Sequence, residues 1–229
     1  MPFLEEVGIV MIIKLPEDVS LIIHILEKAG YEAYAVGGCI RDKVLGRVPQ
    51  DWDITTSARP QEIKHLFKKT IDTGIQHGTV TVLLNHTGYE VTTYRIDGEY
   101  EDSRHPNSVE FTDNLRLDLE RRDFTINAMA YNDTRGLIDE FMGMEDIKAH
   151  MIRCVGDAGA RFDEDALRML RAVRFSGQLG FRMEENTRQA IVERAGNLKN
   201  ISAERIRTEL SKLLVSKDAG ELREAYRTG

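Results

Sequence analysis

The stretch from Tyr34 to Thr56 constrains the fold of this chain more than any other. It reads Y-A-V-G-G-C-I-R-D-K-V-L-G-R-V-P-Q-D-W-D-I-T-T. A short apolar run meets a Gly-Gly turn, a charged segment of helical character follows, and two aspartates then stand on either side of a tryptophan. This order predicts a strand, a tight turn, a short helix and a second strand that carries carboxylates.

The glycine pair Gly37-Gly38 predicts a cradle for phosphate. Glycine lets the backbone approach a ligand closely and adopt conformations that other residues avoid. The helix that follows can then aim free N–H groups at phosphate oxygens. Arg41, in the first turn of this helix, adds a fork of charge-assisted donors. A glycine pair taken alone is also typical of an ordinary turn.

Asp51 and Asp53 predict a metal site. If Asp51 to Ile54 form a strand, its period of two places both carboxylates on one face and Trp52 on the other. Such a pair suits Mg²⁺, which takes oxygen ligands and shares its shell with substrate phosphates. A D-x-D pair alone is also typical of a solvated strand end. Its position soon after the glycine pair favours nucleotide binding.

The composition is that of a folded protein with one domain and part of a second. The chain has 229 residues, of which 41% are hydrophobic and 30% are charged, and these shares differ from those of disordered chains. Cys39 and Cys154 are far apart, so neither a disulfide framework nor a zinc site is expected, and a reducing cytoplasm is the expected compartment. No apolar run is long enough to span a bilayer, so no membrane partner is expected.

The charge is distributed unevenly along the chain. The formal net charge is −7 overall, −10 for residues 1–150 and +3 for residues 151–229. An acidic first part fits metal binding better than a broad surface for nucleic acid, because non-specific affinity for nucleic acid comes from clustered cations. If the protein acts on a nucleic acid, most of the contact surface is expected elsewhere.

Periodicity and turn residues predict a mixed helix-strand domain with a hairpin in the first part of the chain. Pro16 to Ala29 has acids in its first turn, apolar residues at helical spacing and a following glycine, which predict an amphipathic helix. The remaining predictions are strands at Tyr31–Val36, Trp52–Thr55, Gly78–Leu84, Tyr89–Arg95 and Leu137–Phe141, and helices at Cys39–Leu45 and Gln61–Lys68. The strands Gly78–Leu84 and Tyr89–Arg95 form the hairpin.

The second part of the chain is predicted to be helical. Strand signals vanish from Ala158 onward, and helices are expected at Arg161–Gln178, Glu184–Ala195 and Ser202–Ser216. We therefore divide the chain into residues 1–155 and 156–229. The polar segment Ile96–Asn107 lacks apolar periodicity and is a candidate mobile loop. A helical pattern at Ala219–Arg227 is under way where the sequence stops, which predicts that the natural protein continues.

Asp165 and Arg168 form a candidate base-reading pair. Within one helix they are neighbours on one face, and Arg171 and Arg174 continue the row. A carboxylate accepts from an exocyclic amine, and a guanidinium donates to the adjacent ring nitrogen. Cytosine and adenine present that pattern, whereas uracil and guanine place an oxygen where the amine should be and leave buried groups unpaired. The alternative is a surface helix with ordinary ion pairs.

Two further charged groups have open interpretations. Arg121-Arg122-Asp123 fits either a network of ion pairs that caps a helix or a clamp on a triphosphate. Glu90 lies in a predicted strand and either faces solvent or brings a third carboxylate to Asp51 and Asp53.

Three segments together resemble a known family. They are G-G-C-I-R-D-K-V-L-G-R with D-W-D-I, then R-R-D-F-T-I-N-A-M-A, and then E-D-A-L-R-M-L-R-A-V-R-F. In this order they closely resemble the bacterial class II tRNA nucleotidyltransferases, or CCA-adding enzymes, and the related poly(A) polymerases of the DNA polymerase beta superfamily. The resemblance covers roughly Tyr31 to Ser216. It implies an α+β head with a small mixed or antiparallel sheet flanked by helices, followed by an all-α neck.

The resemblance also implies a function and its residues. Asp51 and Asp53 would bind Mg²⁺, and the RNA 3′-hydroxyl of tRNA would attack the α-phosphate of CTP or ATP with loss of pyrophosphate. The implied nucleotide contacts are Gly38, Arg41, Arg122, Asp165, Arg168, Arg171 and Arg174. The family's body and tail domains are not in this sequence. The alternatives are a poly(A) polymerase or A-adding enzyme and, in another class, a non-catalytic nucleotide-binding fragment.

Overall fold

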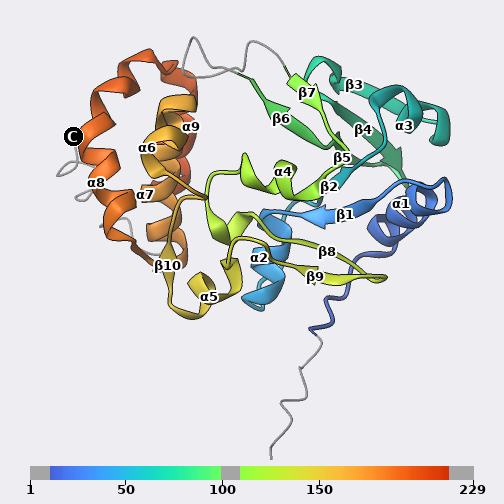
Figure 1. The fold of residues 1–229 in the computed structure, drawn as a ribbon, viewed down its shortest axis with the longest axis horizontal. Coiled ribbons are helices and arrows are strands. Elements are labelled where there is room, and N and C mark those ends of the chain that lie inside the picture. Colours follow the sequence, from blue (N-terminus) through green and yellow to red (C-terminus); the bar gives the residue numbers. More distant parts are fainter. Residues whose placement is uncertain (1–10, 99–108, 217–229) are drawn as a thin grey trace, which may run out of the picture.

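The computed structural model describes residues 11–98 and 109–216 and shows a mixed sheet beside a set of helices (Figure 1). The sheet has seven strands in the order β3-β4-β5-β2-β1-β8-β9. The strands are β1 (Ala33–Val36), β2 (Asp53–Thr56), β3 (Thr70–Gly74), β4 (Thr79–Leu84), β5 (Thr87–Thr93), β8 (Ala130–Asn132) and β9 (Gly136–Ile138). The α+β class expected from the sequence is confirmed.

One pair of strands in the sheet is parallel, and the other five pairs are antiparallel. β2 runs parallel to β5, with Asp53 opposite Glu90. The predicted hairpin is present as β4 and β5, and its turn lies at Asn85 and His86, which both have positive φ. The edge strand β3 was not predicted, because Ile71 is its one large apolar residue and its residues Thr70–Gly74 lack the alternation that marks a half-buried strand.

The two faces of the sheet are covered by different helices. Helices α1 (Glu17–Lys28) and α3 (Pro60–Leu66) pack on the face that carries Ile54 and Val91. Helix α4 (Leu115–Glu120) packs on the opposite face against Tyr34 and Tyr94. The predicted amphipathic helix is confirmed as α1, whose apolar residues at helical spacing are buried.

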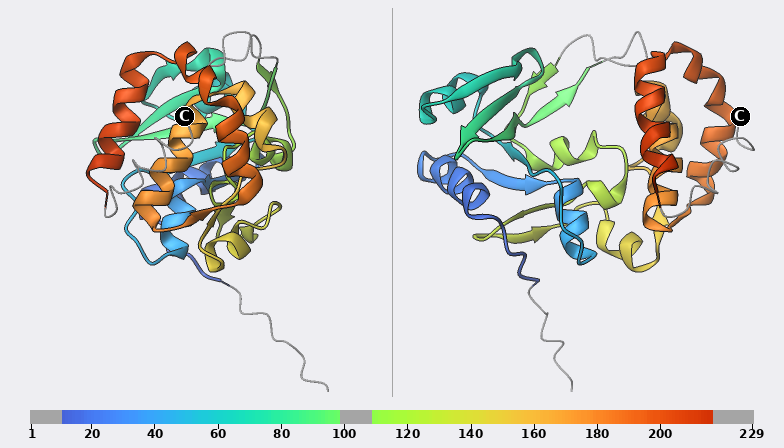
Figure 2. Two further views of the ribbon diagram at one scale, coloured as in Figure 1. Left: turned by 90° about the vertical axis from the view of Figure 1, so that its left-hand side faces the viewer. Right: turned by 180° about the vertical axis from the view of Figure 1, so that it is seen from behind.

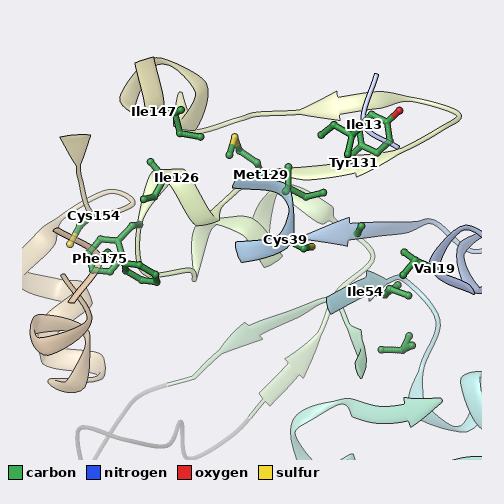
Figure 3. Packing of buried hydrophobic residues seen from close by; sticks show 14 of the residues in the cluster. Ile13, Val19, Cys39, Ile54, Ile126, Met129, Tyr131, Ile147, Cys154 and Phe175 are labelled. Atoms are coloured by element: carbon green, nitrogen blue, oxygen red, sulfur yellow. The ribbon is translucent and has the colours of Figure 1, made fainter. Parts of the chain in front are cut away.

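The helical part contains four α-helices in its described range, and they lie together at one end of the sheet (Figure 2). They are α6 (Ala158–Glu164), α7 (Leu167–Leu179), α8 (Glu185–Arg194) and α9 (Ala203–Leu214). One hydrophobic cluster continues from Val19 of α1 to Phe175 of α7, past Ile126 and Cys154 (Figure 3). The helices and the sheet therefore share a core, which also includes the small elements α2 (Gly38–Val44) and α5 (Gly143–Lys148).

The structure corrects the prediction of a single helix at Arg161–Gln178. The chain forms α6 and α7 instead, and Asp165 between them has an extended backbone with φ −140° and ψ 102°. The Asp165 side chain accepts a hydrogen bond from the Leu167 N–H at 3.0 Å and so competes with helical bonding. The helical spacing of apolar residues continues across the break, because α6 and α7 each have an apolar face.

Two expectations about strands also need correction. β11 (Arg182–Met183) pairs in parallel with β10 (Met151–Ile152), so strand structure does not end before Ala158. Both strands have two residues, too few to show alternation. Ile96 and Asp97 belong to β6 (Arg95–Asp97), which pairs with β7 (Val109–Phe111), and so they are not part of an irregular loop.

Two other predicted segments fall wholly or partly outside the described part of the chain. They are residues 99–107 of the expected loop and the terminal helix at Ala219–Arg227. Within the described part, no helix combines the length and the apolar character that crossing a membrane requires.

Candidate functional site

The predicted carboxylates gather at one end of β2. Asp53 is its first residue and is the register partner of Glu90 on β5. Both side chains therefore lie on one face of the sheet, the face on which α4 packs. Asp51 precedes β2, so the condition that one strand include both aspartates is not met. Trp52, between the two aspartates, is partly buried and packs against the larger hydrophobic cluster.

Electrostatics show that these carboxylates interact. Burial raises the pKa of Asp53, the Arg122 guanidinium lowers it, and Asp51 raises it again, with a net upward shift. Burial also raises the pKa of Glu90, and the charges of Asp53 and Asp51 add to that effect. Both pKa shifts arise mainly from burial, and the neighbouring carboxylates add a smaller repulsion that a bound cation would relieve.

The donors fit a hard cation that completes its shell from the substrate. Within residues 11–98 and 109–216, no three His, Cys, Asp or Glu side chains come close enough together to hold a metal ion. The site therefore offers carboxylate oxygens without a closed cage. Mg²⁺ is usually bound by one or two carboxylates together with phosphates and water, so this donor set suits it.

The glycine turn lies beside the carboxylates. Gly37 has φ 84° and ψ −131°, a conformation that L side chains rarely adopt. A Cβ at this position would lie 3.0 Å from Nη1 of Arg122, so the absence of a side chain lets the guanidinium approach the turn. Gly38 begins α2, whose first N–H groups have no partner in the helix itself.

Arg122 is anchored at one end only. Its Nη2 donates to Asp118 at 3.4 Å, while its buried Nε finds no partner among the described residues. Asp118 is fully buried and also accepts from Arg121 and from the Thr55 hydroxyl of β2. Burial alone raises the pKa of Asp118, but Arg121 and Arg122 outweigh burial and lower it. The network fits the ion-pair interpretation of Arg121, and it leaves the Arg122 guanidinium only partly paired among the described residues.

Arg41 is buried, and most of its hydrogen-bond donors have partners within the protein. Its Nη1 donates to Asn127 at 2.7 Å, its Nε and Nη2 donate to Asp42, and its guanidinium lies 4.8 Å from the ring centre of Phe175. In this arrangement Arg41 joins α2 to α7 as a structural link. Its predicted contact with a nucleotide stays a prediction.

The predicted base-reading residues do not form one row on one helix. Asp165 lies before α7, where Arg205 of α9 donates to its Oδ2 at 2.8 Å and to its Oδ1 at 3.4 Å. Arg168 is in the first turn of α7 and donates to Glu164 and to the Arg161 and Arg121 carbonyls. No hydrogen bond from its Nε occurs in the described part of the chain. The side chains of Asp165 and Arg168 thus have different hydrogen-bond partners, although the two residues are close in sequence.

The other two neck arginines belong to different ion pairs. Arg171 donates to Asp123, which follows Arg122, and Arg174 donates to the buried Glu209 of α9. Both guanidiniums approach the Phe175 ring, at 5.4 Å and 4.0 Å from its centre. The four residues Asp165, Arg168, Arg171 and Arg174 therefore surround the junction between α7, α9 and the sheet domain.

Sequence reasoning missed the residues that hold the predicted ones in place. Asp118, Asn127, Arg205 and Glu209 all contact a predicted site residue. Asn127 and Asp118 lie beside the R-R-D segment, and their proximity to it was a usable signal. Arg205 and Glu209 lie in an ordinary amphipathic pattern, and only their spacing of four residues marks them as sharing a face.

The sequence matches the family described as "Poly A polymerase head domain" over residues 33–153. It also matches "Probable RNA and SrmB- binding site of polymerase A" over residues 180–229. Because the first match covers more than half of the chain and includes the carboxylates and the glycine turn, the chain belongs to the poly(A) polymerase head domain family.

Its relatives include proteins named CCA-adding enzyme. That of Leuconostoc mesenteroides is 52% identical over 213 residues, which are 92% of this chain and 53% of the relative. That of Lactobacillus delbrueckii subsp. bulgaricus is 56% identical over 194 residues, or 85% of this chain and 49% of the relative. The chain therefore spans about half the length of the curated relatives it matches.

Solved structures agree with the fold. The Bacillus stearothermophilus CCA-adding enzyme in complex with CTP has a TM-score of 0.87 and 47% identity, with 94% of this chain and 53% of that chain covered. The Thermotoga maritima CCA-adding enzyme complexed with tRNA has a TM-score of 0.75 and 28% identity, with 93% and 52% covered. The expected fold class, a mixed sheet flanked by helices and followed by a helical part, is thereby confirmed.

Proposed function

We propose that this chain is the nucleotide-binding and transferring part of a CCA-adding enzyme. The observation that carries the proposal is the group formed by Asp53, Glu90 and Arg122 beside the glycine turn. Neighbouring carboxylates suit a cation, and a partly paired guanidinium suits a phosphate. The identity to CCA-adding enzymes supports the product, which is C and A added from CTP and ATP to the 3′ end of tRNA.

Each residue has a role in this proposal. Asp51 and Asp53 would hold a divalent cation, which we propose to be Mg²⁺, with Glu90 beside them. When bound, the cation lowers the pKa of the attacking 3′-hydroxyl and neutralises charge on the phosphates. Arg122 and the turn at Gly37-Gly38 orient the triphosphate for in-line displacement of pyrophosphate. Most of the rate then comes from positioning and charge stabilisation.

The neck supplies the choice of base. Asp165 would accept from the exocyclic amine of cytosine or adenine, and the Nε–H of Arg168 would donate to the adjacent ring nitrogen. Uracil and guanine present an acceptor where Asp165 needs a donor, and this mismatch leaves polar groups unpaired. Arg171 would fix α7 against the sheet domain through Asp123, and Arg174 would fix α7 against α9 through Glu209.

We also propose that residues 1–155 and 156–229 act as head and neck, and that the remainder of a longer protein holds the tRNA. The −10 charge of residues 1–150 supports this, because it argues against a broad phosphate-binding surface on the head. Two buried free cysteines, Cys39 and Cys154, are consistent with the cytoplasm as the compartment.

The test is incorporation of labelled CTP and ATP into a tRNA that lacks its CCA end, by the protein that carries this chain. Products extended by three nucleotides are expected with both triphosphates present. In the same assay, Asp53→Ala should leave the fold intact by circular dichroism and abolish incorporation. Wild-type activity in this variant would refute the assignment of Asp53 as a metal ligand.

The matched head-domain family favours one alternative, a polymerase that adds only A. Incorporation of ATP without CTP onto a tRNA ending before its CCA, in long products, would establish it. A third outcome is triphosphate binding by residues 1–229 without transfer to any RNA. That result would assign nucleotide binding to this part of the protein and catalysis to the longer chain.

A further inference from the structure

The face of the sheet that carries Asp53 and Glu90 continues outward over β4 and β3. Glu90 of β5 pairs with Thr81 of β4, and Thr81 pairs with Ile71 of β3. Side chains of paired residues lie on the same face of a sheet, so one row runs from the predicted metal site at Asp53 to the edge strand. The row is open to solvent at its outer end, because Ile71 is 49% exposed.

A second row lies beside the first on the same face. Leu83 of β4 pairs with Gly88 of β5, and the Leu83 N–H donates to the Lys69 carbonyl at 3.0 Å. Because side chains alternate along a strand, Lys69 and Leu83 share the face of Ile71 and Thr81. We call the five residues Lys69, Ile71, Thr81, Leu83 and Gly88 the outer strip.

The outer strip offers hydroxyl, apolar and cationic groups, and none of its side chains is acidic. The hydroxyls of Thr81 and Thr73 lie 2.8 Å apart, and either can donate to the other. One of the two therefore keeps its hydrogen for an outside acceptor. Lys69 is exposed and has no ion-pair partner among the described residues. Lysine and threonine side chains of this kind contact the phosphates and sugars of nucleic acids.

The stereochemistry of the proposed transfer selects the occupant of the strip. Gly37 follows β1, and Val36 of β1 is the register partner of Asp53. The glycine turn and Arg122, the proposed triphosphate contacts, therefore lie on the β1 side of Asp53, whereas the outer strip lies on its β5 side. In an in-line displacement, the attacking and the leaving oxygens stand on opposite sides of the phosphorus. Because pyrophosphate leaves toward β1, the attacking hydroxyl arrives from the side of β5.

We propose that the outer strip holds the last nucleotides of the acceptor RNA and aims their 3′-hydroxyl at the metal site. The inference deepens the proposed function and rests on it. Thr81 donates to a sugar or phosphate oxygen behind the reacting hydroxyl, and Lys69 contacts a phosphate further from the metal. Neighbouring strands are ~4.8 Å apart, so the backbones of Thr81 and Asp53 are roughly 10 Å apart. The end of an RNA strand can span that distance.

The first experiment measures CTP incorporation into a tRNA that lacks its CCA end, by the protein that carries this chain. Thr81→Val keeps the shape of the side chain and removes the hydroxyl, so kcat/KM for tRNA should fall about fivefold. Lys69→Gln should lower the same quantity about threefold at low salt and less at high salt. The dissociation constant for CTP, measured by calorimetry, should stay unchanged in both variants.

The same edge of the sheet provides matched controls. Thr70 and Lys68 each precede a residue of the strip, and alternation places their side chains on the opposite face. Thr70 pairs with Val82, which is buried in the larger hydrophobic cluster on that face. Thr70→Val and Lys68→Gln should therefore keep the wild-type kcat/KM for tRNA.

The second experiment detects the contact directly by photo-cross-linking. A benzophenone attached to Ile71→Cys should cross-link to the last nucleotides of the tRNA, whereas Cys39 and Cys154 are buried and are protected from the label. Asp72→Cys is the control, because Asp72 is the next residue of β3 and pairs with Lys64 of α3 on the opposite face. The label on Asp72→Cys should give no cross-link to these nucleotides.

The outcomes separate the inference from its foundation. A wild-type protein that adds no nucleotide to RNA would overturn the proposed function and this inference with it. An active wild type, together with wild-type kinetics in Thr81→Val and Lys69→Gln and no cross-link from Ile71→Cys, would overturn the inference alone. Weaker CTP binding by Thr81→Val would place the triphosphate on the strip and would also overturn it. If Thr81→Val does not fold, Lys69→Gln and the cross-link decide.

Discussion

Arg171 of α7 donates from both Nε and Nη2 to a single oxygen, Oδ2, of Asp123. Asp123 is the last residue of the R-R-D segment, and its other oxygen accepts from the Phe124 N–H and from Asn127. This ion pair therefore ties the neck to the segment that carries Arg122. Loss of this ion pair should weaken the packing between the proposed base-reading residues and Arg122, the proposed phosphate contact.

Asp123→Ala should destabilise the chain by about 3 kcal/mol at pH 7, because it removes a buried carboxylate and leaves the half-buried Arg171 guanidinium without its partner. Burial alone raises the pKa of Asp123, but Arg171 and Asn127 outweigh burial and lower it to about 2. A lowered pKa in the folded state stabilises the fold above the unfolded pKa, near 4, and this contribution is lost as the pH falls to about 2. Urea unfolding of wild type and variant across this pH range should show that the difference between their free energies of unfolding decreases as the pH falls.

Asp53→Asn should remove the response of the chain to Mg²⁺. The wild type should melt at a higher temperature as MgCl₂ is added, since a ligand that binds only the folded state stabilises it. The variant should melt at least as high as the wild type without the cation, because burial, the largest cause of the raised pKa of Asp53, disfavours the charged carboxylate in the folded state. Asp72→Asn, on the exposed edge strand β3, is the control and should keep the full response. A response in Asp53→Asn equal to that of the wild type would refute the assignment.

Glu90→Gln tests whether Glu90 belongs to the metal site or only lies beside it. If its carboxylate helps to hold the cation, the variant needs several times more Mg²⁺ for half of the thermal shift. If Glu90 only lies near the site, the variant needs only slightly more Mg²⁺, because it loses a nearby negative charge but no ligand. We expect the second result, because no three carboxylates among the described residues come close enough together to hold one metal ion, although the strand register places Glu90 beside Asp53. A thermal-shift titration with MgCl₂ distinguishes the two.

Gly37→Ala should cost about 1–3 kcal/mol of stability, since its φ and ψ are unfavourable for any residue with a side chain. It should also weaken triphosphate binding, because the new Cβ would meet Arg122 at 3.0 Å and displace it. Gly46→Ala is the matched control. Gly46 also has positive φ, at 68°, but a Cβ there meets nothing within 4 Å. Isothermal calorimetry with ATP should show weaker binding for Gly37→Ala only, and equal binding in both variants would count against the cradle.

Local patterns in the sequence predicted the separate pieces well. These patterns are the apolar residues at helical spacing in α1, the turn residues between β4 and β5 and the glycine pair before α2. Each depends on only a few neighbouring residues, so the local sequence is enough to predict the structure that it forms. The same holds for the charged residues of the site, whose types already define a chemistry. The site assignments that depend on a bound nucleotide stay predictions.

Partnerships between distant segments depended on the tertiary structure. The parallel pairing of β2 with β5 sets Glu90 beside Asp53, and no periodicity within either strand specifies that register. The break at Asp165 arose where a side chain bonded to the backbone and to Arg205 of a later helix. The sequence alone determined which side chains were available for phosphate, cation and base. Packing over long distances decided which of them meet, because contact between remote residues depends on how the whole core closes.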